Sequence, residues 1–540
     1  YDPKNGIDGE MRDIWIEDGT VVPAPGPEKR AAAETVDVAG QVVMPGGVDI
    51  HTHVAGSKVN TGRKLRPDDH LGHERAATSL TRSGSGYTTP STFLTAYRYA
   101  ELGYTTIMEA ASAPLDARHA HEEFEDMPIL DKGLFITMGN NHFIMDAIRR
   151  GEYAMARDYA AWLLAATKGY AIKAVNPGGV DNWKWRKNVS EWDEKTVEYE
   201  VTPRQILTTL ARIAEDLGLP HPPHVHGLNL GRGSSARTSM ESFKLLEGRK
   251  AHFCHLQFLS YKTHKSGLHR SDAPAVAEAV NRTPEITLDV GQLVFGPATT
   301  MTSDGPLEYN LHKSIGGKWC NKDVENETGG GIVPVVYART NPIHTLMWCA
   351  GLELFLLTAD PWRLSLTTDH PNGGPFTAYP QVIRLLMDRD YRAETLSGLH
   401  RLARTTSLAA LDREYSLSEI AVITRAGPAR TLGLDRKGHL GPGADGDVAV
   451  FRDDPDREAM FSRPSFVFKG GILVVRDGVI VAVPPGRTLY VAPEYDPAIL
   501  KPVREHFARA YTLAFENFPI ENDPLRHSLC VPCRTPERLS

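Results

Sequence analysis

The feature that most constrains the fold is an alternation of short apolar strands and amphipathic helices through the middle of the chain. Apolar residues recur at helical spacing over 153–168, 203–217 and 342–356. One expected strand ends at His51, and the others cover 105–110, 133–138, 170–175, 223–226, 251–258, 285–290 and 364–368. Eight strands separated by helices or long connections predict an α/β fold, a (β/α)8 barrel of the TIM type.

The two ends of the chain have a different pattern, with short alternating runs bounded by turn residues. These runs cover 13–22 and 39–43 near the start, and 447–451, 466–475 and 478–483 near the end. We expect them to form one small β-sandwich built from both termini. The predicted division is therefore 1–44 and 423–490 for the sandwich, 45–422 for the barrel, and 491–540 for an extension that packs on a partner or on the surface.

His51 and His53 stand at the end of the first barrel strand, after the apolar residues Val48 and Ile50. Side chains two apart on a strand point to the same side. Two neutral imidazoles at one strand end can bind one divalent metal ion. The pair therefore predicts a metal site at this end of the strand.

Other strands carry possible metal ligands at the same end. They are Lys173 in the fourth strand, His224 and His226 in the fifth, His252 and His255 in the sixth, and Asp369 after the eighth. A single strand histidine is more often a hydrogen-bonded core residue, and an Asp after a strand is often a helix cap. Such residues at five of eight strand ends favour a functional centre, because catalytic groups of these barrels lie at the carboxyl ends.

The order His-x-His, Lys, His, His, Asp resembles the binuclear members of the amidohydrolase superfamily. Residues 425–434 and 438–450 resemble the return of that family to its β-domain. Within the superfamily, residues 1–10, 172–179, 224–231 and 252–258 are similar to the A-type subunits of formylmethanofuran dehydrogenases and of the related bacterial formyltransferase/hydrolase complexes.

This resemblance implies a centre of two divalent metal ions, expected to be Zn²⁺, and a Lys173 carboxylated by CO₂ that bridges them. It implies that His51, His53 and Asp369 hold one ion, that His226 and His255 hold the other, and that Asp369 is the catalytic acid and base. The superfamily motifs favour His226 over His224 and His255 over His252. We expect His224, His252, Asn176 and Asn229 beside the ligands rather than on the metal.

The function implied by the resemblance is hydrolysis of an N-formyl carrier of the methanofuran type to formate and the free amine, in one-carbon metabolism. The expected partners are B- and C-type subunits together with one that carries the formyltransferase activity. The abundance of Arg and Ala favours the bacterial complex. Alternatives are the A-type subunit of an archaeal-type formylmethanofuran dehydrogenase, a cyclic-amide hydrolase of the dihydropyrimidinase or hydantoinase type, and a barrel that has lost its chemistry.

Bulk properties exclude several other classes of protein. The net charge of −7 and the absence of a strong basic patch argue against a nucleic-acid partner. No apolar run is long enough to span a bilayer. Five scattered cysteines do not form a disulfide framework and indicate a cytoplasmic protein. We interpret Cys530 and Cys533 as two cysteines in a tail rather than as half of a metal site.

Three further segments give expectations that the structure can test. His119 and His121 form a second His-x-His pair, which the surrounding glutamates mark as solvated surface. The long connections 181–200 and 296–339 are expected to carry function or contact partners. Within the first of them, the aromatic and basic run 183–187 is a candidate wall for a groove that receives the carrier, or else a surface that packs against a partner.

Overall fold

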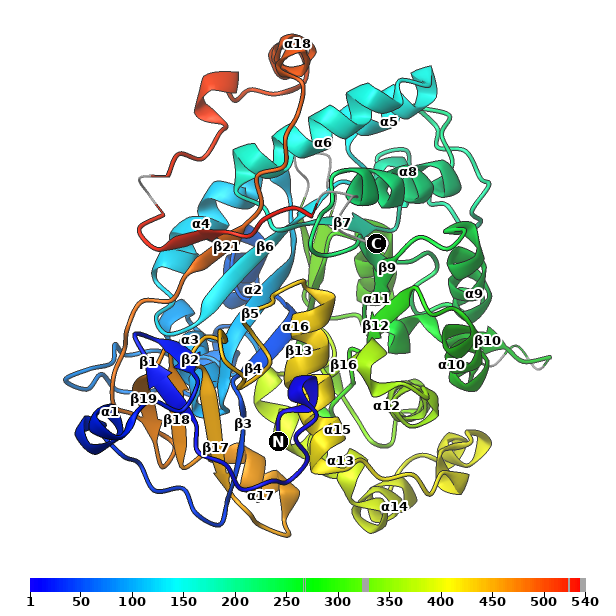
Figure 1. The fold of residues 1–540 in the computed structure, drawn as a ribbon. Coiled ribbons are helices and arrows are strands. Elements are labelled where there is room, and N and C mark those ends of the chain that lie inside the picture. Colours follow the sequence, from blue (N-terminus) through cyan, green and yellow to red (C-terminus); the bar gives the residue numbers. More distant parts are fainter. Residues whose placement is uncertain (266, 268, 323–329, 523–524, 535–540) are drawn as a thin grey trace.

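Eight parallel strands form a nearly closed barrel in the computed structural model, which describes residues 1–265, 267, 269–322, 330–522 and 525–534. The strands are β4 (Gly47–Thr52), β5 (Tyr104–Ser112), β6 (Asp131–Thr137), β7 (Ala171–Val175), β8 (His224–His226), β9 (Ala251–Phe253), β12 (Ile286–Asp289) and β16 (Leu364–Ser365) (Figure 1). Each pairs in parallel with the next. Between β16 and β4 the closure is a parallel bridge from Thr52 to His370. The predicted barrel is confirmed.

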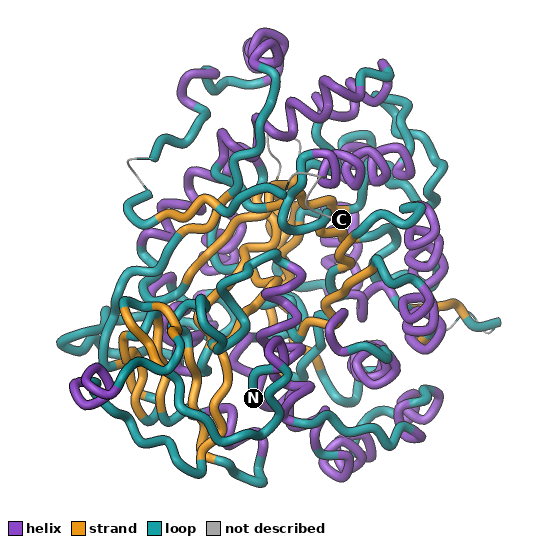
Figure 2. Tube along the Cα trace, viewed as in Figure 1, coloured by secondary structure: helices purple, strands orange, loops and turns teal. Residues whose placement is uncertain are grey.

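Helices lie around the outside of this barrel (Figure 2). Those in the predicted ranges are α6 (Tyr153–Thr167), α8 (Pro203–Asp216) and α12 (Pro342–Leu357). Thr202 and Gln205 form a capping box at the start of α8, and Asn341 caps α12. These caps, each followed by Pro at the first helical position, explain why the helices begin where the apolar period does.

Two barrel strands are much shorter than predicted. The sixth ends at Phe253 because His255 has a φ of +39° and the 3₁₀ helix Leu256–Leu259 follows. The eighth ends at Ser365, although Thr367 still accepts a backbone hydrogen bond from Gln292 at 2.8 Å. In both cases the apolar run continues past the strand, into backbone that shapes the rim of the barrel.

The alternating runs at both ends form small antiparallel sheets (Figure 1). Strands β17 (Val448–Arg452), β18 (Phe466–Lys469), β19 (Ile472–Arg476) and β20 (Val479–Ile480) join β3 (Gln41–Pro45) in the order β20-β19-β18-β17-β3. A separate two-stranded sheet pairs β1 (Trp15–Glu17) with β2 (Thr20–Val22). The β structure thus draws on both termini, as the sequence indicates.

The residues after this sheet return to the barrel. Strand β21 (Thr488–Tyr490) pairs in parallel with β6 and with β22 (Ser528–Cys530). Helix α18 (Leu500–Ala510) brings Phe507 against Trp162 of α6, with ring centroids 5.9 Å apart. The described part of the extension therefore packs on the barrel surface. Cys530 is exposed and Cys533 half-buried, and both are free thiols.

The connection after the seventh strand is itself folded in its described part; residues 323–329 lie outside the described residues. It contains β13 (Gly296–Thr302), helix α11 (Gly305–Ile315), β14 (Cys320–Lys322) and β15 (Gly330–Tyr337). The strands form a three-stranded antiparallel sheet in the order β13-β15-β14. Because it follows β12, this unit lies at the carboxyl end of the barrel, where the predicted ligands are.

A buried ion cluster joins the barrel to the five-stranded sheet. We call it the junction cluster; its members are Asp131, Asp445, Asp447, Lys437, Lys469 and Arg487. Asp131 begins β6, and its Oδ2 lies 2.6 Å from Lys437 Nζ, 2.8 Å from Lys469 Nζ and 2.7 Å from Arg487. Arg436 also lies 2.9 Å from Asp445, so the carboxylates of the cluster already have enough cations to balance them.

The interpretation of the second His-x-His pair is half wrong. His119 is exposed, but His121 is 2% exposed and its ring lies 2.9 Å from the Thr167 carbonyl. Both stand on helix α4 (Ala117–Glu125), where residues two apart point in nearly opposite directions, so His121 faces the core. Among the described residues, no helix has the length and apolar content to cross a membrane.

Candidate metal centre

All six predicted ligands line one cavity of about 430 Å³ at the carboxyl end of the barrel. They are His51, His53, Lys173, His226, His255 and Asp369. Each is at most 5% exposed. The structure therefore brings together side chains that the sequence places as far apart as positions 51 and 369.

One half of the centre is organised around Asp369. Its Oδ1 lies 3.0 Å from His51 Nε2 and 3.3 Å from His53 Nε2. The opposite ring nitrogens contact other carboxylates: His53 Nδ1 lies 2.8 Å from Glu109, and His51 Nδ1 lies 3.1 Å from Asp289. Such contacts favour a hydrogen on Nδ1 and leave the Nε2 lone pairs directed at the site.

Glu109, from β5, also shapes the chain after β4. Its Oε2 accepts backbone hydrogen bonds from Val54 at 2.7 Å and from Ala55 at 3.1 Å. Lys58 Nζ lies 3.2 Å from Oε1. One buried carboxylate therefore fixes both the ring of His53 and the turn that follows it.

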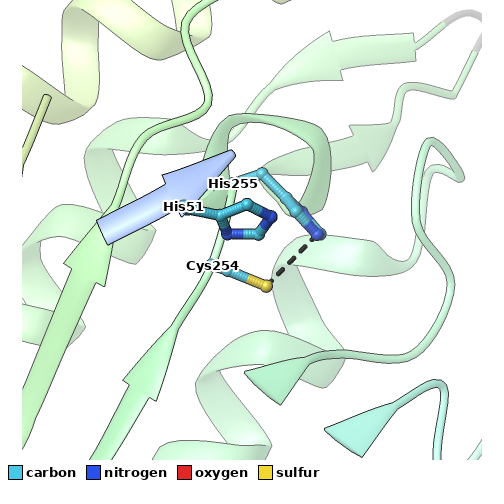
Figure 3. A group of neighbouring side chains, drawn as sticks. All are labelled: His51, Cys254 and His255. Carbon is cyan, nitrogen blue, oxygen red and sulfur yellow. Dashed lines mark hydrogen bonds between the residues drawn. The ribbon is translucent and has the colours of Figure 1, made fainter. Parts of the chain in front are cut away.

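The other half of the centre contains an unpredicted cysteine. Cys254 Sγ lies 3.0 Å from Lys173 Nζ. It lies 3.2 Å from His255 Nε2, the contact drawn as a dashed line in Figure 3. The rings of His226 and His255 are 4.7 Å apart, and His226 Nε2 lies 3.2 Å from Asp304. The thiol thus contacts both the lysine amine and the His255 imidazole, and His226 stands next to His255.

The residues expected beside the ligands also lie there. His224 Nε2 is 2.9 Å from His51 Nδ1, and His252 Nε2 is 3.1 Å from Asp289. Asn176 donates to Asp304 at 3.2 Å. Asn229 lines the cavity and donates to the Ser190 carbonyl at 2.8 Å.

The backbone at the site is strained at several points. Asp369, His255, Asn176 and Asn229 have φ values of +50°, +39°, +38° and +63°. Non-glycine residues rarely adopt this left-handed region, and such strain gathers at functional sites. At Gly291 a Cβ would lie 2.5 Å from that of His255 and 3.4 Å from that of Asp369, so glycine there lets these two residues approach.

The electrostatics suit a metal cation. Burial acts to raise the pKa of Asp369, but His51 and His255 outweigh it and hold the pKa well below its usual value. Burial lowers the pKa of both His226 and His255, so these rings are neutral, as metal ligands must be. Burial opposes a proton on His51, yet Asp289 and Asp369 raise its pKa well above normal; the same two carboxylates favour a metal cation.

An unpartnered nitrogen also fits a metal centre. His255 Nδ1 is buried and has no hydrogen-bond partner among the described residues. Three described sets of side chains here bring their donor atoms within 4.8 Å of one another: His51 with His53 and Asp369, His51 with His224 and Asp289, and His51 with Cys254 and His255. The nitrogen, oxygen and sulfur donors present fit divalent zinc.

Four residues around the ligands were not singled out from the sequence: Glu109, Cys254, Asp289 and Asp304. Glu109 and Asp289 are each the next-to-last residue of a predicted barrel strand. An acidic residue so close to the carboxyl end of a strand is a signal that could have identified them. Cys254 immediately precedes a predicted ligand. Asp304 lies inside a long connection, where no strand position marks it.

The prediction that 183–187 form a wall of the carrier groove is wrong for this cavity. Asn188 lines the cavity, but 183–187 do not. Trp183 instead packs against Tyr309 of α11, with ring centroids 5.3 Å apart. The outer walls come from α11 and the start of α12, so the connection 296–339 supplies part of the site, as expected for a function-bearing segment.

A metal-ligand set at the carboxyl ends of a (β/α)8 barrel is the arrangement of the amidohydrolases, and the family comparison agrees. The model of the amidohydrolase family matches residues 34–482, so this chain belongs to the amidohydrolase family.

Two relatives match over nearly the whole chain. Protein FwdA of Methanocaldococcus jannaschii is 44% identical, covering 97% of this chain and 95% of its own length. The A-type subunit of the formyltransferase/hydrolase complex Fhc of Methylorubrum extorquens is 38% identical, covering 96% and 94%. A chain in the crystal structure of the M. extorquens FhcABCD complex with methylofuran superposes with a TM-score of 0.93 over 99% of this chain and 98% of that one.

Proposed function

We propose that this chain hydrolyses an N-formyl amine carrier of the methanofuran type to formate and the free amine, as the A-type subunit of a larger complex. The observation that carries the proposal is the convergence of His51, His53, Lys173, His226, His255 and Asp369 on one buried cavity. The full-length likeness to a chain of a complex crystallised with methylofuran supports the choice of substrate.

The ligand roles follow from the two halves of the centre. His51, His53 and Asp369 would hold one ion, and His226 and His255 the other, with carboxylated Lys173 between them. Two divalent ions, expected to be zinc, would supply a water of lowered pKa and polarise the formyl carbonyl.

Asp369 is the residue proposed to move protons. It takes a proton from the attacking water and delivers it to the amine nitrogen as the C–N bond breaks. Its other contacts suit this task, since Asn372 donates to Oδ1 at 2.9 Å and holds the carboxylate in place. The backbone at Asp369 is held in the left-handed region, which also fixes the direction of the side chain.

Lys173 is positioned for carboxylation but has a competitor. A neutral lysine amine reacts with CO₂ to form a carbamate, and arginine could not take this role. Cys254 Sγ lies between Lys173 Nζ and His255 Nε2, where a thiolate could itself be a zinc ligand. X-ray absorption separates the two cases, since a zinc–sulfur distance of about 2.3 Å would identify Cys254 as a ligand.

The first test is metal content per chain, by elemental analysis of protein purified with its natural partners and never exposed to chelator. About two zinc ions per chain are expected from the binuclear scheme. One ion would overturn the Lys173 bridge, and none would favour a barrel without the chemistry. Formate release from the formylated carrier then tests the reaction itself.

The same assays separate the competing functions. Ring opening of dihydrouracil or hydantoin without formate release would identify a cyclic-amide hydrolase. In a formylmethanofuran dehydrogenase the same site would work towards formylation, with a redox centre in a partner protein. Identities of 44% and 38% do not separate the archaeal and bacterial kinds of complex. The proteins that co-purify with the chain would decide between them.

A further inference from the structure

Helix α11 runs from the candidate metal centre towards solvent. At its N-cap, Asp304 lies 3.2 Å from His226, and at its last residue Ile315 is 41% exposed. The eleven residues that follow Asp304, up to Ile315, correspond to about 16 Å of helix, at roughly 1.5 Å per residue. One face of α11 lines the cavity along this length, through Asp304, Leu307, Glu308, Leu311 and Ile315.

The cavity changes character along this axis. Its inner end is polar, with the ligands, Asp304 and Asn176 close by. Its outer walls carry several apolar side chains, Leu307, Leu311 and Ile315 from α11 and Ile343 and Met347 from α12, together with polar ones such as Asn310, Ser314 and His344. This gradient fits a ligand whose reacting polar group lies inside and whose apolar body lies between the two helices.

Glu308 is a carboxyl group on this face, one turn outside Asp304. It is 0% exposed and lines the cavity. Its Oε2 lies 3.0 Å from the Thr300 hydroxyl, whereas Oε1 has no hydrogen-bond partner among the described residues. At Gly331 a Cβ would lie 2.5 Å from Glu308 Cβ, so β15 packs tightly behind the residue.

The hydrogen bonds around Thr300 indicate which oxygen of Glu308 carries a proton. Thr300 Oγ1 also lies 2.9 Å from the Val333 carbonyl, which can only accept. If the single hydroxyl hydrogen of Thr300 goes to Val333, Oε2 of Glu308 must donate, leaving Oε1 as a carbonyl-type acceptor. Burial, with Asp304 and Asp369 adding to it, raises the pKa of Glu308 well above its usual value, in agreement with a protonated acid.

A buried glutamate with a purely structural role looks different in this chain. Glu353 of α12 is also 0% exposed, but both of its oxygens are satisfied. Oε2 accepts from Ser271, and Oε1 accepts from the backbone and hydroxyl of Ser407 at 2.6 Å. Buried polar atoms are almost always paired, so the unpaired Oε1 of Glu308 in a ligand cavity calls for a partner from the ligand.

We propose that Glu308 is a positioning residue that binds the nitrogen side of the substrate, with Oε1 accepting the N–H of the formamide. The inference rests on the proposed function. After the carbonyl carbon gains the water oxygen and the C–N bond breaks, Asp369 gives its proton to nitrogen. The free amine still offers N–H groups to Oε1. The site therefore selects secondary formamides, which have an N–H, over tertiary ones, which lack it.

The test compares N-formylbenzylamine with its N-methyl derivative in the metal-loaded complex. The native chain is expected to favour the secondary formamide in kcat/KM by about 10-fold or more, as expected when a buried acceptor is left unpaired. Glu308→Leu should remove this preference, mainly through KM. Glu308→Gln keeps an acceptor oxygen and should retain most of it, and Lys313→Ala, on the same helix but outside the cavity, should behave as native.

A second readout is independent of turnover. Calorimetric titration with benzylamine should give an affinity about 10-fold weaker in Glu308→Leu than in the native complex. Equal affinities, or an undiminished preference for the secondary formamide in Glu308→Leu, would overturn the role of Glu308. If the native complex released no formate from any formamide, including the formylated carrier, the proposed function would fail, while the amine titration would still test Glu308.

Discussion

One carboxylate oxygen of Asp369, Oδ1, contacts two imidazoles from the end of the same strand. It lies 3.0 Å from His51 Nε2 and 3.3 Å from His53 Nε2. A residue in this position can bind a metal ion and exchange a proton with water, and the two roles are separable by substitution. Asparagine keeps the size and one oxygen of aspartate but cannot take up a proton at neutral pH.

We expect Asp369→Asn to lower formate release by at least about 100-fold, the usual contribution of a general acid or base. Part of the metal should stay bound, because His51 and His53 are unchanged. Formate release and metal per chain are measured on the same preparation, with exposed Asp453→Asn as control. Near-native formate release in Asp369→Asn would show that another group moves the proton.

At the residue scale, sequence could predict which side chains meet at the cavity but not all of their partners. His51, His53 and Asp369 stand at strand ends, where the strand period alone fixes which way a side chain points. Glu109 and Asp289 occupy similar positions, yet a single acid in an apolar strand does not reveal which histidine it will face. That pairing depends on the register between strands, which only the tertiary structure sets.

At the scale of elements, Glu109 of β5 links its strand to β4. It accepts hydrogen bonds from the backbone that follows β4 and contacts Nδ1 of His53. Glutamine in its place would direct an amide N–H₂ at groups that themselves donate. Burial alone would raise the pKa of Glu109, but Lys58 and His53 lower it to about 2, so the native carboxyl is ionised.

We therefore expect Glu109→Gln to weaken metal binding by about 10- to 100-fold, the usual effect of removing the partner of a metal-binding histidine. Zinc affinity is measured by competition with a chelator. Glu353→Gln is a matched control, because it also alters a buried, fully hydrogen-bonded glutamate but lies in α12, outside the cavity. If both variants bound zinc equally well, Glu109 would have no role beyond stability.

The elements themselves were largely predictable, because apolar period and caps act locally. Helices α6, α8 and α12 begin at the predicted residues. The rim was harder to predict: the apolar run 251–258 does not reveal that His255 turns into the left-handed region. The packing of α11 over the cavity also depends on contacts distant in sequence, such as Asp304 with His226.

At the scale of the whole molecule, the barrel and the five-stranded sheet meet through the junction cluster. The sequence indicates β structure from both termini but gives no sign of these ion pairs, which join positions 131, 437 and 469. Lys437, Lys469 and Arg487 overcome the effect of burial and hold the pKa of Asp131 well below its usual value. Asp131 is thus ionised in the folded protein at neutral pH.

Asp131→Asn would leave the buried Lys437 and Lys469 and the partly exposed Arg487 with two carboxylates. We expect the free energy of unfolding at pH 7 to fall by about 3–5 kcal/mol, as when one partner of a buried ion pair is removed. Because the folded pKa of Asp131 lies below that of the unfolded chain, about 3.9, its contribution is complete above about pH 5 and declines as the pH falls towards the folded pKa.

The difference in stability between native and Asp131→Asn proteins should therefore be largest at neutral pH and shrink below about pH 4. Urea unfolding at a series of pH values measures it. Asp453→Asn removes a carboxylate that is 57% exposed and should change stability by less than about 1 kcal/mol. A difference that stayed constant from pH 7 to pH 3 would mean that Asp131 stabilises the junction through shape and hydrogen bonds rather than through its charge.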